Sequence, residues 1–185
     1  MLDAAHTEHF GYRRLLERER TPTGEGPLVR VVGSVKINQP ADQIWAYVTD
    51  YGNDTSWRAS VRQMRPSRPG PAQVGVTTHD TLRLLGLTFR TDASIDRVEA
   101  GRLLTRHAHD RQKQLRGARL VEPTGLGTCR FTEVVEVGLL GLLRTLEPLV
   151  AWLLHWQATA DLGRLKHLLE TPPVSSGPAP EETAT

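Results

Sequence analysis

Residues 29–57 read VRVVGSVKINQPADQIWAYVTDYGNDTSW, and this stretch decides the fold because a strand pattern gives way to a helix pattern at one proline. From Val29 to Ile37, apolar and polar residues alternate, and this period of two is typical of a strand with one buried face. Pro40 then suits the first position of a helix, where its missing N–H needs no partner. Apolar residues recur at helical spacing after it, and Gly52 is placed to end the helix. The stretch therefore predicts a strand followed at once by a short amphipathic helix.

Composition divides the 185 residues into one core-forming stretch and two flanking segments. Residues 28–170 hold most of the regularly spaced apolar residues, and a stretch of this size can bury one substantial core. Residues 1–27 mix a few large apolar side chains with many charges and end in TPTGEGP, so we expect a short helix and a linker. Residues 171–185 are rich in Pro and hold one Val as their only large apolar residue, which predicts a disordered tail.

Charge and cysteine content exclude several classes of function. The net charge is +2, and the 23 basic and 21 acidic residues are interspersed, so a nucleic-acid partner is not expected. The single cysteine, Cys129, excludes an intrachain disulfide and is expected to be a small core residue. Residues 1–20 contain no apolar core of a secretory signal, which predicts a cytoplasmic location.

After Trp57 the chain shows six more segments with strand patterning, followed by a long helix candidate over 139–170. The connections at Leu85-Gly86 and Ala100-Gly101 are too short for a crossover helix, so neighbouring strands should be antiparallel. Seven such strands can bury one face only if the sheet curls around something, and the long helix is large enough to fill it. The pattern predicts an α+β fold, with the six later strands at 60–65, 73–84, 87–98, 102–109, 115–122 and 127–137.

This order of elements, with several short motifs, resembles the START-like (SRPBCC) superfamily, specifically its polyketide cyclase/dehydrase and lipid-transport branch. The motifs that carry the resemblance are PADQIWAYVTD at 40–50, Trp57, Val74-Gly75 at a strand start, the GLGT turn at 125–128 and DLGRLKHLLE at 161–170. The resemblance covers residues 28–170. It implies a helix-grip, a seven-stranded curved antiparallel sheet wrapped around a long C-terminal helix, with a hydrophobic small-molecule site between them. It identifies neither the ligand nor a reaction.

Hairpin register places two carboxylates on the inner face of the predicted sheet. With Leu85-Gly86 as a two-residue loop, Asp80 faces Thr91 on a face that is otherwise mostly apolar. In the last strand, Glu133 shares its face with apolar residues such as Phe131. Both acids are therefore candidates for general acid–base catalysis on a substrate carbonyl or hydroxyl. The alternative is that each is paired with an inward Arg or hydroxyl and serves the fold, since an isolated carboxylate is costly to bury.

Candidate ligand contacts come from the aromatic residues and from the other inward positions. Tyr51 and Trp57 are placed to wall one end of a cavity, because aromatic side chains bind rings well. Packing in the core is the alternative role for both. The sheet and the long helix supply the remaining candidates, which are Thr78, Phe89, Thr91, Phe131, Leu154 and Asp161.

His107 and His109 share one face of a predicted strand and are further candidates for ligand contact. Their direction depends on the loop around Glu99 to Gly101, because a three-residue loop turns them inward and a two-residue loop turns them out. Two histidines alone are a poor signature of a metal site, so neither a metal nor a cofactor is expected.

The long helix candidate has two apolar faces, whereas a helix that packs on one sheet needs only one. One stripe, which includes Leu154, should pack on the sheet, and Pro148 should separate a short leading helix from the main one. We expect the second face to line a cavity or to be covered internally, while a homodimer contact and a peripheral membrane contact stay open as alternatives. A transmembrane segment is not expected, because charges and Pro148 interrupt the apolar stretch. The second face comprises Leu142, Leu146, Leu149, Leu153 and Trp156.

These observations predict a protein, monomeric or homodimeric, that encloses a hydrophobic small molecule of polyketide or lipid-like chemistry. One hypothesis is an enzyme with polyketide cyclase/dehydratase-like activity, in which Asp80 or Glu133 moves protons. The other is a carrier, sequestering protein or sensor without catalysis, in which the same acids anchor polar ends of the ligand. A third class is an interaction protein that uses the second face of the long helix.

Overall fold

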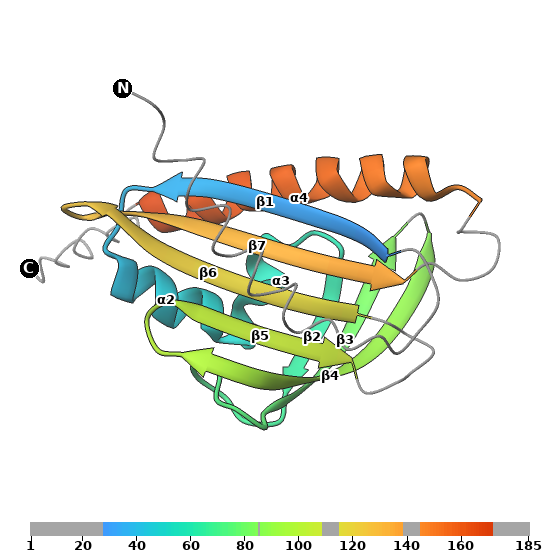
Figure 1. The fold of residues 1–185 in the computed structure, drawn as a ribbon, viewed down its shortest axis with the longest axis horizontal. Helices are drawn as coiled ribbons and strands as arrows, with labels where there is room; N and C mark the ends of the chain where they lie inside the picture. Colours follow the sequence, from blue (N-terminus) through green and yellow to red (C-terminus); the bar gives the residue numbers. More distant parts are fainter. Residues whose placement is uncertain (1–27, 85, 109–114, 139–144, 172–185) are drawn as a thin grey trace, which may run out of the picture.

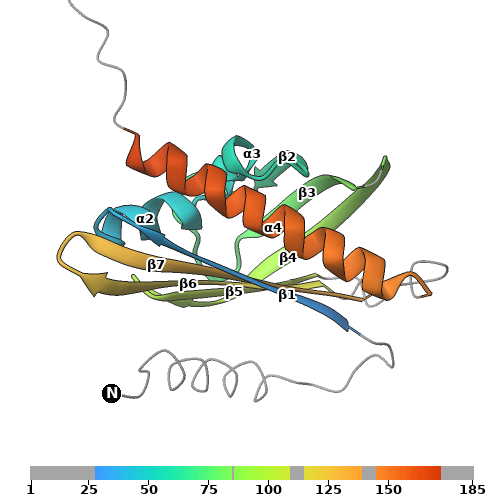
Figure 2. The same cartoon turned by 90° about the horizontal axis from the view of Figure 1, so that it is seen from above.

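The computed structural model describes residues 28–84, 86–108, 115–138 and 145–171. They form a seven-stranded antiparallel sheet in the order β1-β7-β6-β5-β4-β3-β2, and the described helices lie on its concave face (Figures 1 and 2). This arrangement confirms the helix-grip α+β fold. The strands are β1 (Leu28–Ile37), β2 (Val61–Pro66), β3 (Thr77–Leu84), β4 (Leu87–Glu99), β5 (Leu103–Ala108), β6 (Leu115–Gly125) and β7 (Thr128–Gly138).

The β3–β4 hairpin fixes which of its side chains face the helices. In the β3–β4 hairpin, Leu84 pairs with Leu87 and Asp80 with Thr91, so the predicted register is confirmed. The strand expected from residue 73 begins only at Thr77. That part of the prediction is wrong, because Gly75 takes a φ of 86°, which belongs to a turn rather than to a strand.

The segment after β1 contains more helix breaks than predicted. Helix α2 spans Ala41–Thr49, with Pro40 just before its first residue, and it ends ahead of Gly52. The Asp50 side chain accepts a hydrogen bond from the Gly52 N–H at 3.0 Å and so opens the short 3-10 helix η1 (Tyr51–Asn53). Helix α3 (Asp54–Trp57) follows directly. Gly52 therefore lies in a separate turn and does not end α2.

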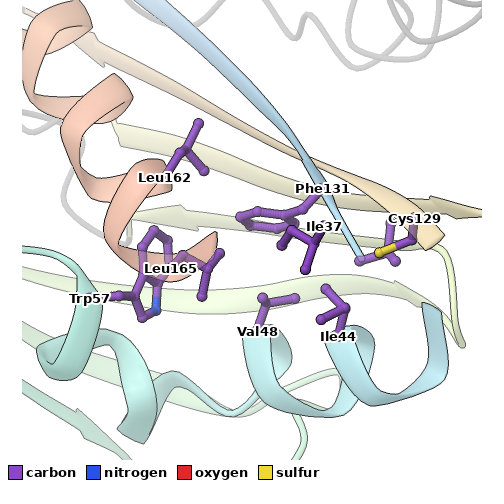
Figure 3. Packing of buried hydrophobic residues seen from close by; sticks show 9 residues of the cluster. Ile37, Ile44, Val48, Trp57, Cys129, Phe131, Leu162 and Leu165 are labelled. Carbon is purple, nitrogen blue, oxygen red and sulfur yellow. The ribbon is translucent and has the colours of Figure 1, made fainter. Parts of the chain in front are cut away.

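The main hydrophobic core joins α2, the second half of α4 (Glu147–Glu170) and one end of the sheet (Figure 3). Trp57 and Phe131 meet edge to face with ring centres 6.1 Å apart, and both are essentially fully buried. Burial of each such side chain contributes about 1.5–3 kcal/mol. Cys129 is fully buried beside them, which confirms it as a core residue. The cluster comprises Ile37, Ile44, Val48, Trp57, Val121, Cys129, Phe131, Leu162 and Leu165.

Helix α4 rests mainly on the edge strand β1. Gly33 permits the close approach, because a Cβ atom there would lie 2.6 Å from the Leu162 Cδ1 atom. Nearer the start of the helix, Val150 packs against Val29 and Val31, with Leu154 beside them. Because α4 packs mainly on β1, it does not cover the concave surfaces of the central strands.

The second apolar face of α4 is largely exposed. Leu149 is 54% exposed and Trp156 is 62% exposed, and Trp152 beside them is 64% exposed. The expectation that this face is covered internally is therefore wrong for Leu149 and Trp156, since α4 turns its opposite side to the sheet. Leu142 and the predicted leading helix lie outside the described residues, and the main helix has Pro148 in its first turn. No helix of the described ranges is long and apolar enough to cross a membrane.

Candidate functional site

Arg106 is the centre of a buried ion pair on the concave face. It projects from β5, and its Nη1 donates to Asp80 Oδ2 at 2.7 Å and to Thr78 Oγ1 at 3.1 Å, both on β3. The Asp80 and Arg106 side chains are 1% and 7% exposed. Gly117 leaves space for the Arg106 side chain, because a Cβ atom at this position would lie 3.3 Å from the Arg106 Cγ and Nε atoms. The predicted inward direction of Asp80 therefore agrees with the structure, and Arg106 neutralises its charge.

Arg119 is the centre of a second cluster, one strand further along the sheet. Its Nη2 donates to Asp54 Oδ2 at 2.6 Å and to Glu133 Oε1 at 3.1 Å, and its Nη1 donates to the Val48 carbonyl oxygen at 2.5 Å. Arg58 approaches the same two acids, at 3.2 Å from Asp54 and 3.5 Å from Glu133. Glu133 thus faces inward as predicted and is held by two guanidinium groups.

Tyr51 connects the two clusters. The guanidinium carbon of Arg106 lies 4.7 Å from the centre of the Tyr51 ring, and that of Arg119 lies 4.3 Å from it. At these distances the ring attracts both cations, most strongly where water is excluded, and Tyr51 is 2% exposed. Asp80 and Glu133, predicted separately from two strands, therefore belong to one charged network.

The charges of the network stabilise one another. Burial opposes ionisation of Asp54, but the guanidinium groups of Arg119 and Arg58 outweigh it and hold the pKa of that carboxyl below its ordinary value. Burial likewise disfavours the charged form of Arg119, yet Asp54 and Glu133 raise the pKa of its guanidinium. Burial raises the pKa of the Tyr51 hydroxyl, which keeps it neutral. Within the described part of the chain, three arginines thus face three carboxylates around a neutral ring.

The network keeps some hydrogen-bonding capacity. Among the described residues, Asp80 Oδ1 and Asp54 Oδ1 are buried without a hydrogen-bond partner, and so is Trp57 Nε1. Glu133 is the network acid with the most solvent contact, since its side chain is 12% exposed. It is therefore the carboxylate that a molecule on the concave face reaches first.

Half-buried apolar side chains adjoin this network on the concave face. They lie toward the end of the sheet that α2 leaves uncovered, where Leu115 pairs with Val137 and Gly117 with Val135. Since α4 packs mainly on β1 and α3, these side chains keep partial exposure. The site therefore combines a charged, buried floor with an apolar, partly open surface. That surface comprises Phe89, Ala108, Leu115, Val135 and Val137.

Asp161 acts at a different place, where α4 meets the chain between α3 and β2. Its Oδ1 accepts a hydrogen bond from the Ala59 N–H at 3.1 Å and pairs with Arg164. Burial raises the pKa of the Asp161 carboxyl, although these two partners and Arg58 oppose the rise. This predicted ligand contact therefore joins two elements of the fold.

The remaining predicted ligand contacts divide between the site and the core. Thr78 and Thr91 lie beside Asp80 in the β3–β4 hairpin, and Phe89 belongs to the apolar surface. Trp57 and Phe131 are 1% and 0% exposed in the main core. Leu154, half-buried, packs on β1 near the start of α4. Trp57 and Phe131 therefore belong to the hydrophobic core and not to the surface of the site.

His107 requires a correction, because it lies on the convex face, away from the other candidates. The loop before β5 has three residues, since Glu99 pairs with Leu103, but a β-bulge between Ile95 and Arg97 shifts the register. His107 consequently faces Ser94 and contacts Asp96 at 3.4 Å, with its side chain 47% exposed. The rule that a three-residue loop turns His107 inward holds only for a regular strand, and the bulge reverses it. His109 lies outside the described residues.

Sequence reasoning missed the cations that bind the predicted acids. Arg119 lies opposite Glu133 only because a β-bulge between Pro123 and Gly125 shifts the β6–β7 register that the turn at 125–128 would otherwise set. Arg106 depended on the bulge in β4, which sequence patterning does not reveal. Asp54 is the first residue of α3 and Arg58 directly follows the helix, whose one-turn length gave no periodic signal.

A curved antiparallel sheet that grips a C-terminal helix and carries an apolar concave surface defines a hydrophobic ligand-binding fold of the START-like class. Residues 29–170 match the family described as polyketide cyclase / dehydrase and lipid transport, and the chain belongs to this family. None of the curated proteins compared with the sequence matches it.

Several solved structures share the fold at low sequence identity. TTHA0849 from Thermus thermophilus has 13% identity and a TM-score of 0.65 over 76% of this chain and 96% of its own. The Zhui aromatase/cyclase from Streptomyces sp. R1128 has 11% identity and a TM-score of 0.66 over 83% and 100%. A START superfamily protein from Mycobacterium smegmatis has 12% identity and a TM-score of 0.61 over 76% and 97%. At these identities the likeness shows the fold alone.

Proposed function

We propose that this protein binds a polyketide or lipid-like molecule against the concave face of β4 to β7, as a carrier, sequestering protein or sensor. The observation that carries the proposal is the half-buried apolar surface of Phe89, Ala108, Leu115, Val135 and Val137 next to the charged network. Apolar side chains left partly exposed on a concave surface gain free energy when a ligand removes them from water. The family membership supports the same class of ligand.

The pairing of the acids supports binding over proton transfer. Asp80 and Glu133 each accept hydrogen bonds from an arginine, so one oxygen of each carboxylate is already engaged within the protein and is not free to contact a substrate. A polar group of the ligand would then contact Glu133, and the apolar body would lie along Val135 and Phe89. Such a site holds an amphiphilic molecule in one orientation.

A valine substitution tests the proposed surface. Val135→Gln places an amide on the concave face and is expected to weaken binding of 1-anilinonaphthalene-8-sulfonate at least tenfold, because the amide loses water to an apolar ligand. Val74→Gln, at a valine that is 63% exposed in the loop before β3, is the matched control and should change the affinity less than twofold. Fluorescence titration measures both, with circular dichroism to verify folding. Equal affinity in the two variants would contradict the proposed surface.

A catalytic role is the second candidate, and the partial exposure of Glu133 favours it, because a general base must reach its substrate. Native mass spectrometry of the full chain would first identify a co-purifying compound by mass. With that compound as substrate, Glu133→Gln and Asp80→Asn should keep affinity within a few-fold and abolish turnover. Product formation at the unchanged rate in both variants would leave binding alone as the function.

A further inference from the structure

The convex face of the sheet carries a cluster of buried side chains. Leu103 and Val134 are each 2% exposed, and Leu120 is 8% exposed. The members face one another across β5, β6 and β7, where Leu103 pairs with Leu120 and Ala118 with Val134. We call these residues the convex cluster, and they are Leu103, Thr105, Ala118, Leu120, Thr132 and Val134.

The described helices do not cover this cluster. Helices α2, α3 and α4 all lie on the concave side, and their packing partners come from the inward positions of the strands (Figure 2). A leucine on an open sheet face keeps contact with water on its outer side, so an exposure of 2% at Leu103 requires atoms packed over it. We propose that residues 1–27 of the same chain dock on the convex cluster through their apolar side chains.

The other segments outside the described residues fit this role poorly. Residues 109–114 read HDRQKQ and have no apolar side chain to offer. Residues 139–144 must connect the end of β7 to α4 on the concave side within six residues, which leaves no length to fold back. Residues 172–185 come after α4, a helix on the concave side, and contain Val174 as their one large apolar residue. The N-terminal segment is the remaining occupant.

The N-terminal segment is long enough to reach the convex cluster, and it carries apolar side chains that can pack on it. It ends directly before β1, three strands away from β5, or about 14 Å at the usual strand spacing of about 4.8 Å. Residues 21–27, TPTGEGP, span about 20 Å when extended, which is enough for the crossing. Tyr12, Leu15 and Leu16 follow a spacing of three and four residues, which places them on one side of a helix.

Thiol labelling of the full chain tests the docking. Ala118→Cys puts a reactive group inside the convex cluster, and Cys129, buried in the main core, serves as an internal reference for unfolding. We expect the new thiol to resist 5,5′-dithiobis(2-nitrobenzoate) in an otherwise native chain. Adding Leu15→Asp and Leu16→Asp should accelerate its labelling at least tenfold while Cys129 stays protected. Arg13→Asp with Arg14→Asp is the matched control and should leave the rate within twofold.

Three results would overturn the proposal. The first is rapid labelling of the new thiol in the chain with a native N-terminal segment. The second is protection that persists after Leu15→Asp and Leu16→Asp. The third is protection that depends on protein concentration, which would assign the cover to a second copy. Should Ala118→Cys expose Cys129 as well, Thr132→Cys probes the same cluster with a side chain of nearly unchanged size.

Discussion

At the residue scale, removing one partner of the buried pair of Asp80 and Arg106 should destabilise the protein more than the intact pair stabilises it. Asp80→Asn leaves the guanidinium buried without its countercharge, and breaking such a pair costs about 3–5 kcal/mol of unfolding free energy. Replacing both residues together, as Asp80→Asn with Arg106→Met, should cost less than the single change because no lone charge remains. Urea denaturation of the three proteins measures the difference. A single-variant loss below about 1 kcal/mol would show that the pair is hydrated.

Asp54 gives the network a defined response to acid. Its folded pKa is held below the unfolded value, so its contribution to stability is fully present above the unfolded pKa and is lost as pH falls through the folded pKa. Asp54→Asn should therefore destabilise the protein by about 3 kcal/mol at pH 7, and the gap to the wild type should narrow below about pH 4. Urea midpoints from pH 3 to pH 7 measure the gap. Asp42→Asn, at an exposed carboxylate in α2, controls for the change in net charge.

At the element scale, the contact between α4 and β1 depends on Gly33, because a glycine has no side chain to keep the helix away. Gly33→Ala would bring a Cβ atom within 2.6 Å of Leu162 Cδ1, so we expect a loss of about 1–3 kcal/mol from overpacking. Gly163→Ala, inside α4 with nothing within 4 Å of the added methyl group, should instead stabilise the helix by about 0.5–1 kcal/mol. Thermal unfolding of both variants measures the two shifts. A stabilising shift for Gly33→Ala would contradict the packing argument, because it would mean that Leu162 moves aside at no cost.

The elements themselves were predictable where a local rule governs them. The two-residue loop at the tip of the β3–β4 hairpin placed Asp80 opposite Thr91, because strand register follows from loop length. The β-bulge before Arg97 has no such signal, and it turned His107 to the convex face. Tertiary contacts decided the rest, since α3 is a single turn held between the sheet and α4.

At the scale of the whole molecule, the sequence predicted the enclosing fold better than the site within it. The alternation in β1, the apolar length of α4 and the short turns sufficed for the helix-grip. The site depends on long-range ion pairs, such as Arg119 with Asp54, and nothing local in either segment indicates the other. Strand register identified Asp80 and Glu133 from the sequence, but only the three-dimensional structure reveals that Arg106 and Arg119 pair with them.

The pairing of β1 with β7 affects how the molecule is made. Leu28 lies opposite Gly138, so β1, which is made before the other described strands, waits for β7, the last of them, before its inner edge is hydrogen-bonded. At synthesis rates of about 5–20 residues per second, this interval lasts several seconds or more. Folding rates fall as contacts become more distant in the chain, and an unpaired strand is open to pairing with other chains. A nascent chain that stops short of residue 128 lacks the partner of β1, so this topology leaves that strand edge open to other chains until synthesis is nearly complete.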